Sequence, residues 1–219
     1  MTTIRIWFTK TGEASYISLL DLQRVMQRAL KRSGLPVWYT LGFNPHIYMT
    51  FAAPLSLGQE SLAETVDFKS EAEDYDWDAA CPALSACLPR GIEVTRIAPA
   101  VLDANDIACA AYEVHYEQKD AQAARAAWEA YNAAPAAEVV KAGKRGKKKT
   151  VDLKAHLPAA QLVQEEGALA VCMRLPAGSV MNVNPMLLLG WLEETQGLPA
   201  AAGSILRTGI YTQSGEKFS

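Results

Sequence analysis

The sequence has few cysteines and no closely spaced pair of them. Its four cysteines, Cys81, Cys87, Cys109 and Cys172, form no C-x-x-C motif. Common zinc sites and redox-active dithiols use such pairs, so the spacing argues against both. Two of the cysteines fall within apolar patterns, where a thiol behaves as a small hydrophobic side chain. We therefore predict reduced, structural cysteines, no metal site and no cofactor.

A long apolar run is also missing. No stretch approaches the roughly 20 apolar residues that a membrane-spanning helix needs. The opening residues, MTTIRIWFTKTG, lack the basic-then-apolar order of a secretory signal. Half of the 219 residues are hydrophobic, which is typical of a globular protein. We predict a cytoplasmic protein that does not associate with membranes.

Basic and acidic residues nearly balance over the whole chain, but one segment carries only basic ones. Lys and Arg number 21 against 24 Asp and Glu, for a formal net charge of −3. The stretch KAGKRGKKK, residues 141–149, holds six of the basic residues and no acid, so the remainder carries 15 basic against 24 acidic residues, or −9. The pattern predicts a cationic patch on an acidic body.

The first hundred residues alternate between strand and helix patterns. In IRIWFT, residues 4–9, apolar Ile4, Ile6 and Phe8 take every second position, as in a strand with one buried face. Ser18 and Asp21 form a variant capping box ahead of an apolar stripe, which predicts a helix that ends before Gly34.

Turn residues in YTLGFNPH precede a predicted hairpin over residues 46–69. A second helix is predicted to start at a cap on Asp78, which would place Pro82 in the first turn, where its missing N–H is tolerated. IEVTRI, residues 92–97, is the last strand. The order is β-α-β-β-α-β, the ferredoxin-like split unit.

The same cycle begins again after residue 107. The pattern predicts a strand at 111–117, an Ala-rich helix at 120–134, and a long hairpin whose tip is the basic run at 141–149. A strand at 167–176, a helix that starts at Asn184 and Pro185, and a strand at 205–212 complete it. Residues 156–167 fit either an additional strand or a loop. We predict an α+β fold of two tandem ferredoxin-like (βαββαβ) units with antiparallel sheets, at residues 1–100 and 107–219.

Two phrases stand out in the amino-terminal half: Lys10 and Gly12 followed by Ile17, Ser18, Leu20, Asp21 and Leu22, and then Gly42, Phe43, Asn44, Pro45 and His46. In these phrases the chain resembles the radical SAM-linked protein family, bacterial domains of unassigned function. The lysine-rich hairpin followed by TVDLKAHL, and the closing RTGIY, are also similar to the family. Leu19 stands where the family has histidine, and Ile47 where it has proline.

The resemblance implies a partner. Family domains occur fused to radical SAM proteins or encoded beside them, so the resemblance implies a radical SAM protein as partner. This chain has no C-x-x-x-C-x-x-C, the three-thiolate spacing that holds a cluster with one open iron. We predict no catalytic residue and no radical SAM chemistry in the chain itself.

Basic residues point to RNA as a second partner. Arg24, Arg28, Lys31 and Arg32 lie off the apolar stripe of their helix, which suits either phosphate binding or a solvated surface. Lysines crowded at a hairpin tip repel one another, and a polyanion relieves this repulsion; a flexible solubilising loop is the alternative. His46 could act as a general base, but its place after Asn-Pro favours a structural or ligand-contacting role. The predicted RNA-binding residues are Lys10, Arg24, Arg28, Lys31, Phe43, Asn44, His46, Lys141, Lys144, Arg145, Lys147, Lys148 and Lys149.

Three functions fit the sequence. The first is a non-catalytic accessory module that binds RNA, transfer or ribosomal, and presents it to a separate radical SAM enzyme. The second is a protein-interaction module that docks that enzyme without nucleic acid. The third is a stand-alone RNA-processing enzyme, which rests on fold-level analogy alone. We expect the first.

Overall fold

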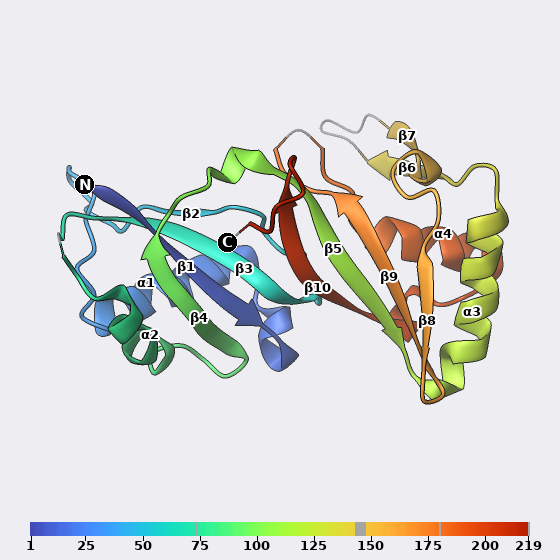
Figure 1. The fold of residues 1–219 in the computed structure, drawn as a ribbon, viewed down its shortest axis with the longest axis horizontal. Helices are drawn as coiled ribbons and strands as arrows, with labels where there is room; N and C mark the ends of the chain where they lie inside the picture. Colours follow the sequence, from blue (N-terminus) through green and yellow to red (C-terminus); the bar gives the residue numbers. More distant parts are fainter. Residues whose placement is uncertain (73, 143–147, 180, 219) are drawn as a thin grey trace. The chain divides into compact units, whose positions relative to one another are not determined.

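In the computed structural model, which describes residues 1–72, 74–142, 148–179 and 181–218, the chain divides into two units (Figure 1). The first consists of Met1–Ala108 and Gly209–Ser219, and the second of Cys109–Thr208. The predicted domains at 1–100 and 107–219 stay a prediction, because a division into units does not show that either folds alone. The predicted α+β class with antiparallel strand pairing is confirmed, with four α-helices among the described residues.

Four antiparallel strands form the sheet of the first unit. The strand order is β4-β1-β3, and β2 also pairs with β3. Ile6 of β1 lies opposite Val66 of β3 on one side and Ile97 of β4 on the other. The predicted hairpin is confirmed, since Thr50 of β2 pairs with Asp67 of β3. The strands are β1 (Thr2–Lys10), β2 (Met49–Phe51), β3 (Glu60–Ser70) and β4 (Ile92–Pro99).

Two helices cover one face of this sheet: α1 (Leu19–Arg32) and α2 (Trp77–Ser85). Ser18 caps α1 as predicted, because its hydroxyl accepts a hydrogen bond from the Asp21 N–H. The predicted cap of α2 was wrong. Asp76, not Asp78, accepts from the Ala79 N–H, so the helix starts at Trp77 and Pro82 lies beyond the first turn.

The core of the first unit follows the predicted alternation. Ile4, Ile6 and Phe8 are buried in one cluster with the apolar stripe of α1. Successive side chains on a strand point to opposite faces, so Thr3, Arg5 and Trp7 of β1 belong to the other face of the sheet. Asp67 and Lys69 of β3 share that face, because they pair with Arg5 and Thr3. We call it the open face, since neither α1 nor α2 packs on it.

The second unit repeats the arrangement around a sheet of order β10-β5-β9-β8. Residues 156–167, whose sequence fits either a strand or a loop, contain strand β8. The predicted lysine-rich hairpin is confirmed as β6 and β7, which form a separate two-stranded sheet. The elements are β5 (Ile107–Tyr116), α3 (Gln118–Ala133), β6 (Glu138–Ala142), β7 (Lys148–Asp152), β8 (Gln161–Glu165), β9 (Ala168–Pro176), α4 (Met186–Gln196) and β10 (Gly203–Thr212).

Aromatic side chains hold α3 and α4 together over this sheet. The Trp128 indole N–H donates to the Tyr116 hydroxyl at 3.0 Å, and the Tyr131 and Trp191 rings meet edge to face with centroids 5.5 Å apart. Burial raises the pKa of Tyr116 to about 12, because a buried phenolate would lose its hydration. The Tyr131 hydroxyl donates to the Leu157 carbonyl, which ties the segment before β8 to α3.

Candidate functional site

The GFNPH phrase forms the tip of a hairpin between α1 and β2. Tyr39 and Ile47 form a β-bridge, and the Thr40 N–H donates to the His46 carbonyl at 2.9 Å. The His46 N–H donates to the Thr40 hydroxyl, and the His46 Nδ1 lies 3.1 Å from both that hydroxyl and the Asn44 carbonyl. The tip is therefore closed by Thr40 and His46, which fits a structural role for His46. We name residues 40–46 the tip loop.

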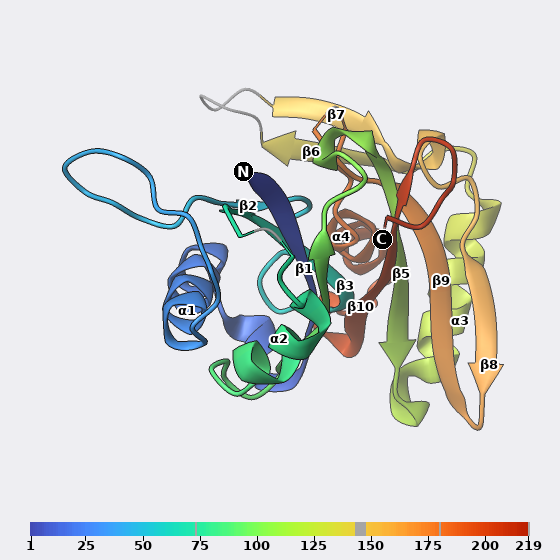
Figure 2. The ribbon, with the colours of Figure 1, turned by 60° about the vertical axis from the view of Figure 1, so that its left-hand side comes forward.

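The tip loop carries two apolar side chains into solvent. Phe43 is fully exposed and Leu41 is 90% exposed. Figure 2 shows the segment between α1 and β2 extending away from the sheet. The loop is also tied to α1, because the Gln27 side chain donates to the Ile47 carbonyl at 3.3 Å. Large side chains with no packing role at the end of a fixed turn are candidates for partner contact.

The predicted basic face of α1 is exposed beside this loop. Arg24, Arg28, Lys31 and Arg32 are all exposed or only partly covered. Arg24 pairs with Asp21 at 3.0 Å, and the Ser18 hydroxyl and Arg24 together lower the pKa of that carboxyl. The Lys31 ammonium lies 5.8 Å from the centroid of the Tyr39 ring, at the base of the tip loop. The structure thus joins α1 to the base of the tip loop, at Tyr39 and Ile47, and a common RNA-binding surface of α1, Phe43, Asn44 and His46 stays a prediction.

Lys10 does not belong to this surface, and its prediction as an RNA contact was wrong. Its side chain is only 2% exposed, and the ammonium donates to the Ser15 carbonyl at 3.0 Å. Residues 12–16 form a 3₁₀ turn directly after β1 and pass over the end of that strand. Lys10 is a buried structural group, since a phosphate cannot reach an ammonium in this position.

The lysine-rich hairpin is described only at its two strands. Lys141 pairs with Lys149, and Ala142 with Lys148. Lys144, Arg145 and Lys147 lie outside the described residues, so their role stays a prediction. Asp152 fixes the base of the hairpin, because its carboxylate accepts from the N–H groups of Ala137 and Lys154, each at 3.0 Å. These two backbone hydrogen bonds lower the pKa of Asp152.

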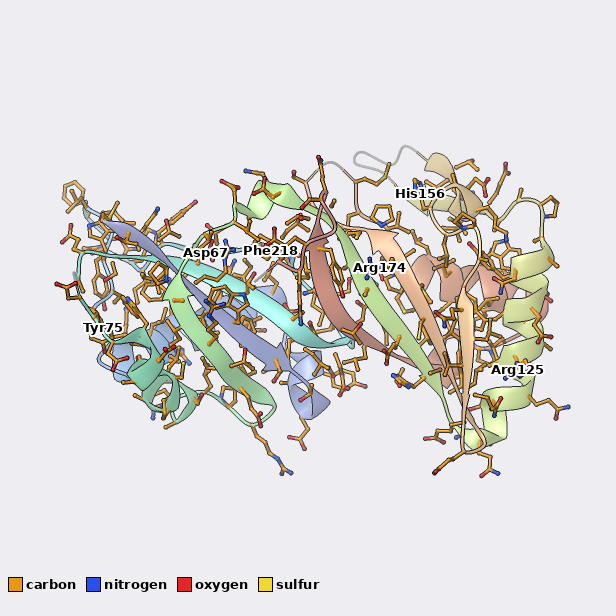
Figure 3. All side chains as sticks on the ribbon, in the orientation of Figure 1. Asp67, Tyr75, Arg125, His156, Arg174 and Phe218 are labelled. Atoms are coloured by element: carbon orange, nitrogen blue, oxygen red, sulfur yellow. The ribbon has the colours of Figure 1, made fainter. Side chains whose placement is uncertain are left out.

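A pocket on the open face of the first unit was not anticipated from the sequence. It has a volume of about 480 Å³ and is lined by the ends of β1, β2 and β3 and by residues 100–105. Arg5 crosses its floor and holds Asp67 through two hydrogen bonds, from Nε at 2.7 Å and from Nη2 at 2.8 Å. The Phe218 ring covers the guanidinium at 4.3 Å (Figure 3). We name this cavity the sheet pocket.

The described residues offer few other candidate sites. Another pocket, of about 430 Å³, lies in the second unit and is lined by residues that include Glu113, His156 and Arg174. In the parts of the chain that the structure describes, no group of three or more His, Cys, Asp or Glu side chains is placed to hold a metal ion. Across the same residues, no helix is long and apolar enough to cross a membrane.

Comparison with known proteins gives one result. A family model described as an uncharacterized protein conserved in bacteria, DUF2344, matches residues 3–185. A comparison with curated proteins found no similar sequence. The matched region includes the tip loop, α1, the lysine-rich hairpin and all residues that line the sheet pocket.

Proposed function

Since the chain belongs to DUF2344, an uncharacterized family conserved in bacteria, we propose that it is a non-catalytic module that binds RNA and presents it to a separate radical SAM enzyme. One observation carries the RNA part of this proposal. The fully exposed Phe43 lies on the tip loop, and the base of this loop is tied through Gln27 and Ile47 to α1, the helix that carries the basic face. Proteins that bind single-stranded RNA combine these two elements, an aromatic ring on which bases stack and cations that follow the backbone.

The radical SAM part rests on the resemblance of the two amino-terminal phrases, residues 10–22 and 42–46, to domains that accompany such enzymes. The lysine-rich hairpin supports the RNA part through its sequence, because six basic residues within 141–149 favour a polyanion. Together these features favour a carrier role over independent catalysis.

We further propose that both units are ferredoxin-like. In each unit, two βαβ halves interleave so that the first and third strands are central, as in β4-β1-β3-β2 and β10-β5-β9-β8. The β6–β7 hairpin is an insertion before β8. Backbone NOEs between β1 and β4, and between β5 and β10, would test this strand order, and their absence would reject it.

RNA binding can be tested by filter binding of bulk transfer RNA and of a short single-stranded RNA in salt from about 50 to about 200 mM. We expect affinity to fall steeply with salt. Replacing Arg24, Arg28 and Lys31 by Gln should reduce the slope of log K against log salt by about 1 for each phosphate that the variant no longer neutralises. Replacing Lys147, Lys148 and Lys149 by Glu should weaken binding to all sequences alike.

The tip loop needs a separate variant. Phe43→Ala should lower affinity about 5- to 150-fold, the range expected when one base loses an aromatic stacking partner. Arg125→Gln is the matched control, because Arg125 is a surface cation of α3 outside the predicted set. RNA would be rejected as the ligand if no binding is seen or if the affinity does not change with salt. It would also be rejected if Arg125→Gln lowers the affinity as much as Phe43→Ala does.

A second candidate is docking of the radical SAM protein without nucleic acid, which the exposed Leu41 and Phe43 favour. Co-expression and co-purification with a radical SAM protein from the same genome would measure it. Loss of co-purification in a Leu41→Ser, Phe43→Ser variant, with retention after the three Gln replacements on α1, would support docking over RNA binding.

A further inference from the structure

We propose that the sheet pocket binds one unpaired ribonucleotide, either free or as part of an RNA. The RNA-borne form rests on the proposed function, whereas the free form does not. The volume of about 480 Å³ falls within the range of small-ligand sites. Its lining combines a carboxylate, an ammonium, hydroxyls and an aromatic ring, which together match the chemical groups of a nucleotide.

Asp67 is the acceptor for the ribose. Arg5 is only 1% exposed and grips this carboxylate from the paired position on the neighbouring strand, so the carboxylate is held in one orientation. Asp67 keeps 15% of its side chain exposed and lines the pocket. A carboxylate has about four acceptor positions, and Arg5 takes two. Those left can accept from adjacent ribose hydroxyls, as acidic residues do in dinucleotide-binding folds.

Arg5 itself has an unused donor. Its Nη1 is buried and has no hydrogen-bond acceptor among the described residues. Buried donors in native proteins nearly always have a partner, and those that do not often face the place of a ligand or solvent molecule. This donor is enclosed, with less than 1 Å² accessible, so it adds positive charge beneath the pocket rather than a contact with the ligand.

Lys69 is the donor for the phosphate. Its ammonium donates one hydrogen bond to the Thr3 hydroxyl, which fixes it at the wall of the pocket. An ammonium has three donors, so two are left for phosphate oxygens. The lining holds two cations, Arg5 and Lys69, and two carboxylates, Asp67 and Asp103, so its formal charge is neutral. A bare phosphate ion therefore gains little from the pocket, and the ligand must also satisfy the carboxylate.

Tyr48 supplies a surface for the base. Its side chain is 55% exposed and lines the pocket next to the exposed Thr50 of β2. A partly exposed aromatic ring at the mouth of a polar pocket is a stacking platform for an unpaired base. Tyr48 also lies two residues after the tip loop in the sequence, which places this stacking surface and Phe43 on the same connection between α1 and β2.

Titration of the full chain with nucleotides, followed by amide NMR shifts, tests the pocket. AMP and UMP should shift residues of β1, β2 and β3, while inorganic phosphate should not. Removing the 2′-hydroxyl, as in dAMP, should weaken binding about 10-fold or more, because a hydrogen bond to a charged group is lost. Tyr48→Ala and Lys69→Gln should each weaken AMP binding by a similar factor. Arg125→Gln, which is outside both the pocket and the predicted RNA-binding set, should not change it.

The outcomes separate this proposal from RNA binding as such. No shift with any nucleotide, equal affinity for AMP and dAMP, or equal binding of phosphate overturns the pocket, even if RNA still binds through the tip loop. AMP binding that depends on Tyr48 in a chain that binds no RNA supports the pocket and rejects the proposed function. A drop in RNA affinity in Tyr48→Ala identifies the nucleotide as part of RNA, and unchanged RNA affinity identifies it as free.

Discussion

Arg5 and Asp67, paired across β1 and β3, form an ion pair with two hydrogen bonds of 2.7 and 2.8 Å, although Arg5 is almost completely buried. The pair has a stability role besides the one proposed for the sheet pocket. Breaking a buried pair leaves one charge without compensation, and this penalty exceeds the value of the pair itself.

We expect Asp67→Asn to lower the free energy of unfolding by about 3–5 kcal/mol. Chemical denaturation would measure this change. The double replacement Arg5→Met, Asp67→Leu should recover most of the loss, since no buried charge is left unpaired. The exposed pair Asp21 with Arg24 is the control, and Asp21→Asn should change stability only slightly. Equal effects at the two pairs would contradict the buried ion pair.

Tyr116 should make stability fall at high pH. Its pKa is raised from 10.0 to about 12 in the folded chain. Between these values the unfolded chain has released the phenol proton and the folded chain has not, so rising pH favours unfolding. The stability from this group is thus present below pH 10 and is lost by pH 12, at up to about 1.4 kcal/mol per pH unit.

The comparison of Tyr116→Phe with the unchanged protein isolates this effect. At neutral pH the variant should lose about 1–3 kcal/mol, because the Trp128 N–H loses its buried acceptor. Above pH 10 the two stability curves should converge. Parallel curves from pH 9 to 12 would contradict the raised pKa.

Gly91 should tolerate no side chain. Its φ is +85°, and a Cβ there would lie 2.3 Å from the Thr11 carbonyl oxygen, which belongs to the backbone and cannot move aside. We expect Gly91→Ala to cost about 2–5 kcal/mol in unfolding free energy, from the left-handed conformation and the clash together. Gly34→Ala is the matched control, with a φ of +73° and open space, and should cost only about 1–2 kcal/mol.

The Asp152 carboxylate should stabilise the base of the lysine-rich hairpin. Asp152→Ala removes the acceptor of the Ala137 and Lys154 amides, so both should lose protection in hydrogen exchange. Asp152→Asn keeps an acceptor oxygen and should lose less. Because the pKa of Asp152 is lowered in the folded chain, its contribution is present above pH 3.8 and is lost as the pH falls through the lower folded value. Unchanged protection of these two amides in Asp152→Ala would show that the hydrogen bonds to Asp152 do not stabilise the base of the hairpin.

Local sequence patterns were sufficient for most of the elements. The alternation of Ile4, Ile6 and Phe8 predicted the buried face of β1, and the Ser18 cap predicted the start of α1. The start of α2 was missed because Asp76 and Asp78 are equally good caps. Packing decides between them, since the Trp77 ring meets Phe68 edge to face at 5.9 Å only if the helix includes Trp77.

The candidate site was predictable only in the part that is formed by residues close together in the sequence. The tip loop is a run of turn residues, and its exposed Phe43 could be inferred from them. The sheet pocket could not, because Arg5 and Asp67 are 62 residues apart and each looks like an ordinary solvent-facing strand residue. Lys10 was misassigned for the same reason, since the turn that buries it is specified by interactions that no short motif contains.

The hairpin β6–β7 pairs with itself and contributes no strand to the sheet of either unit. Changes in its length or charge therefore leave the register of those sheets intact. Substitutions can accumulate in this appendage without altering the scaffold that carries it, so its surface charge and the integrity of the fold can vary independently.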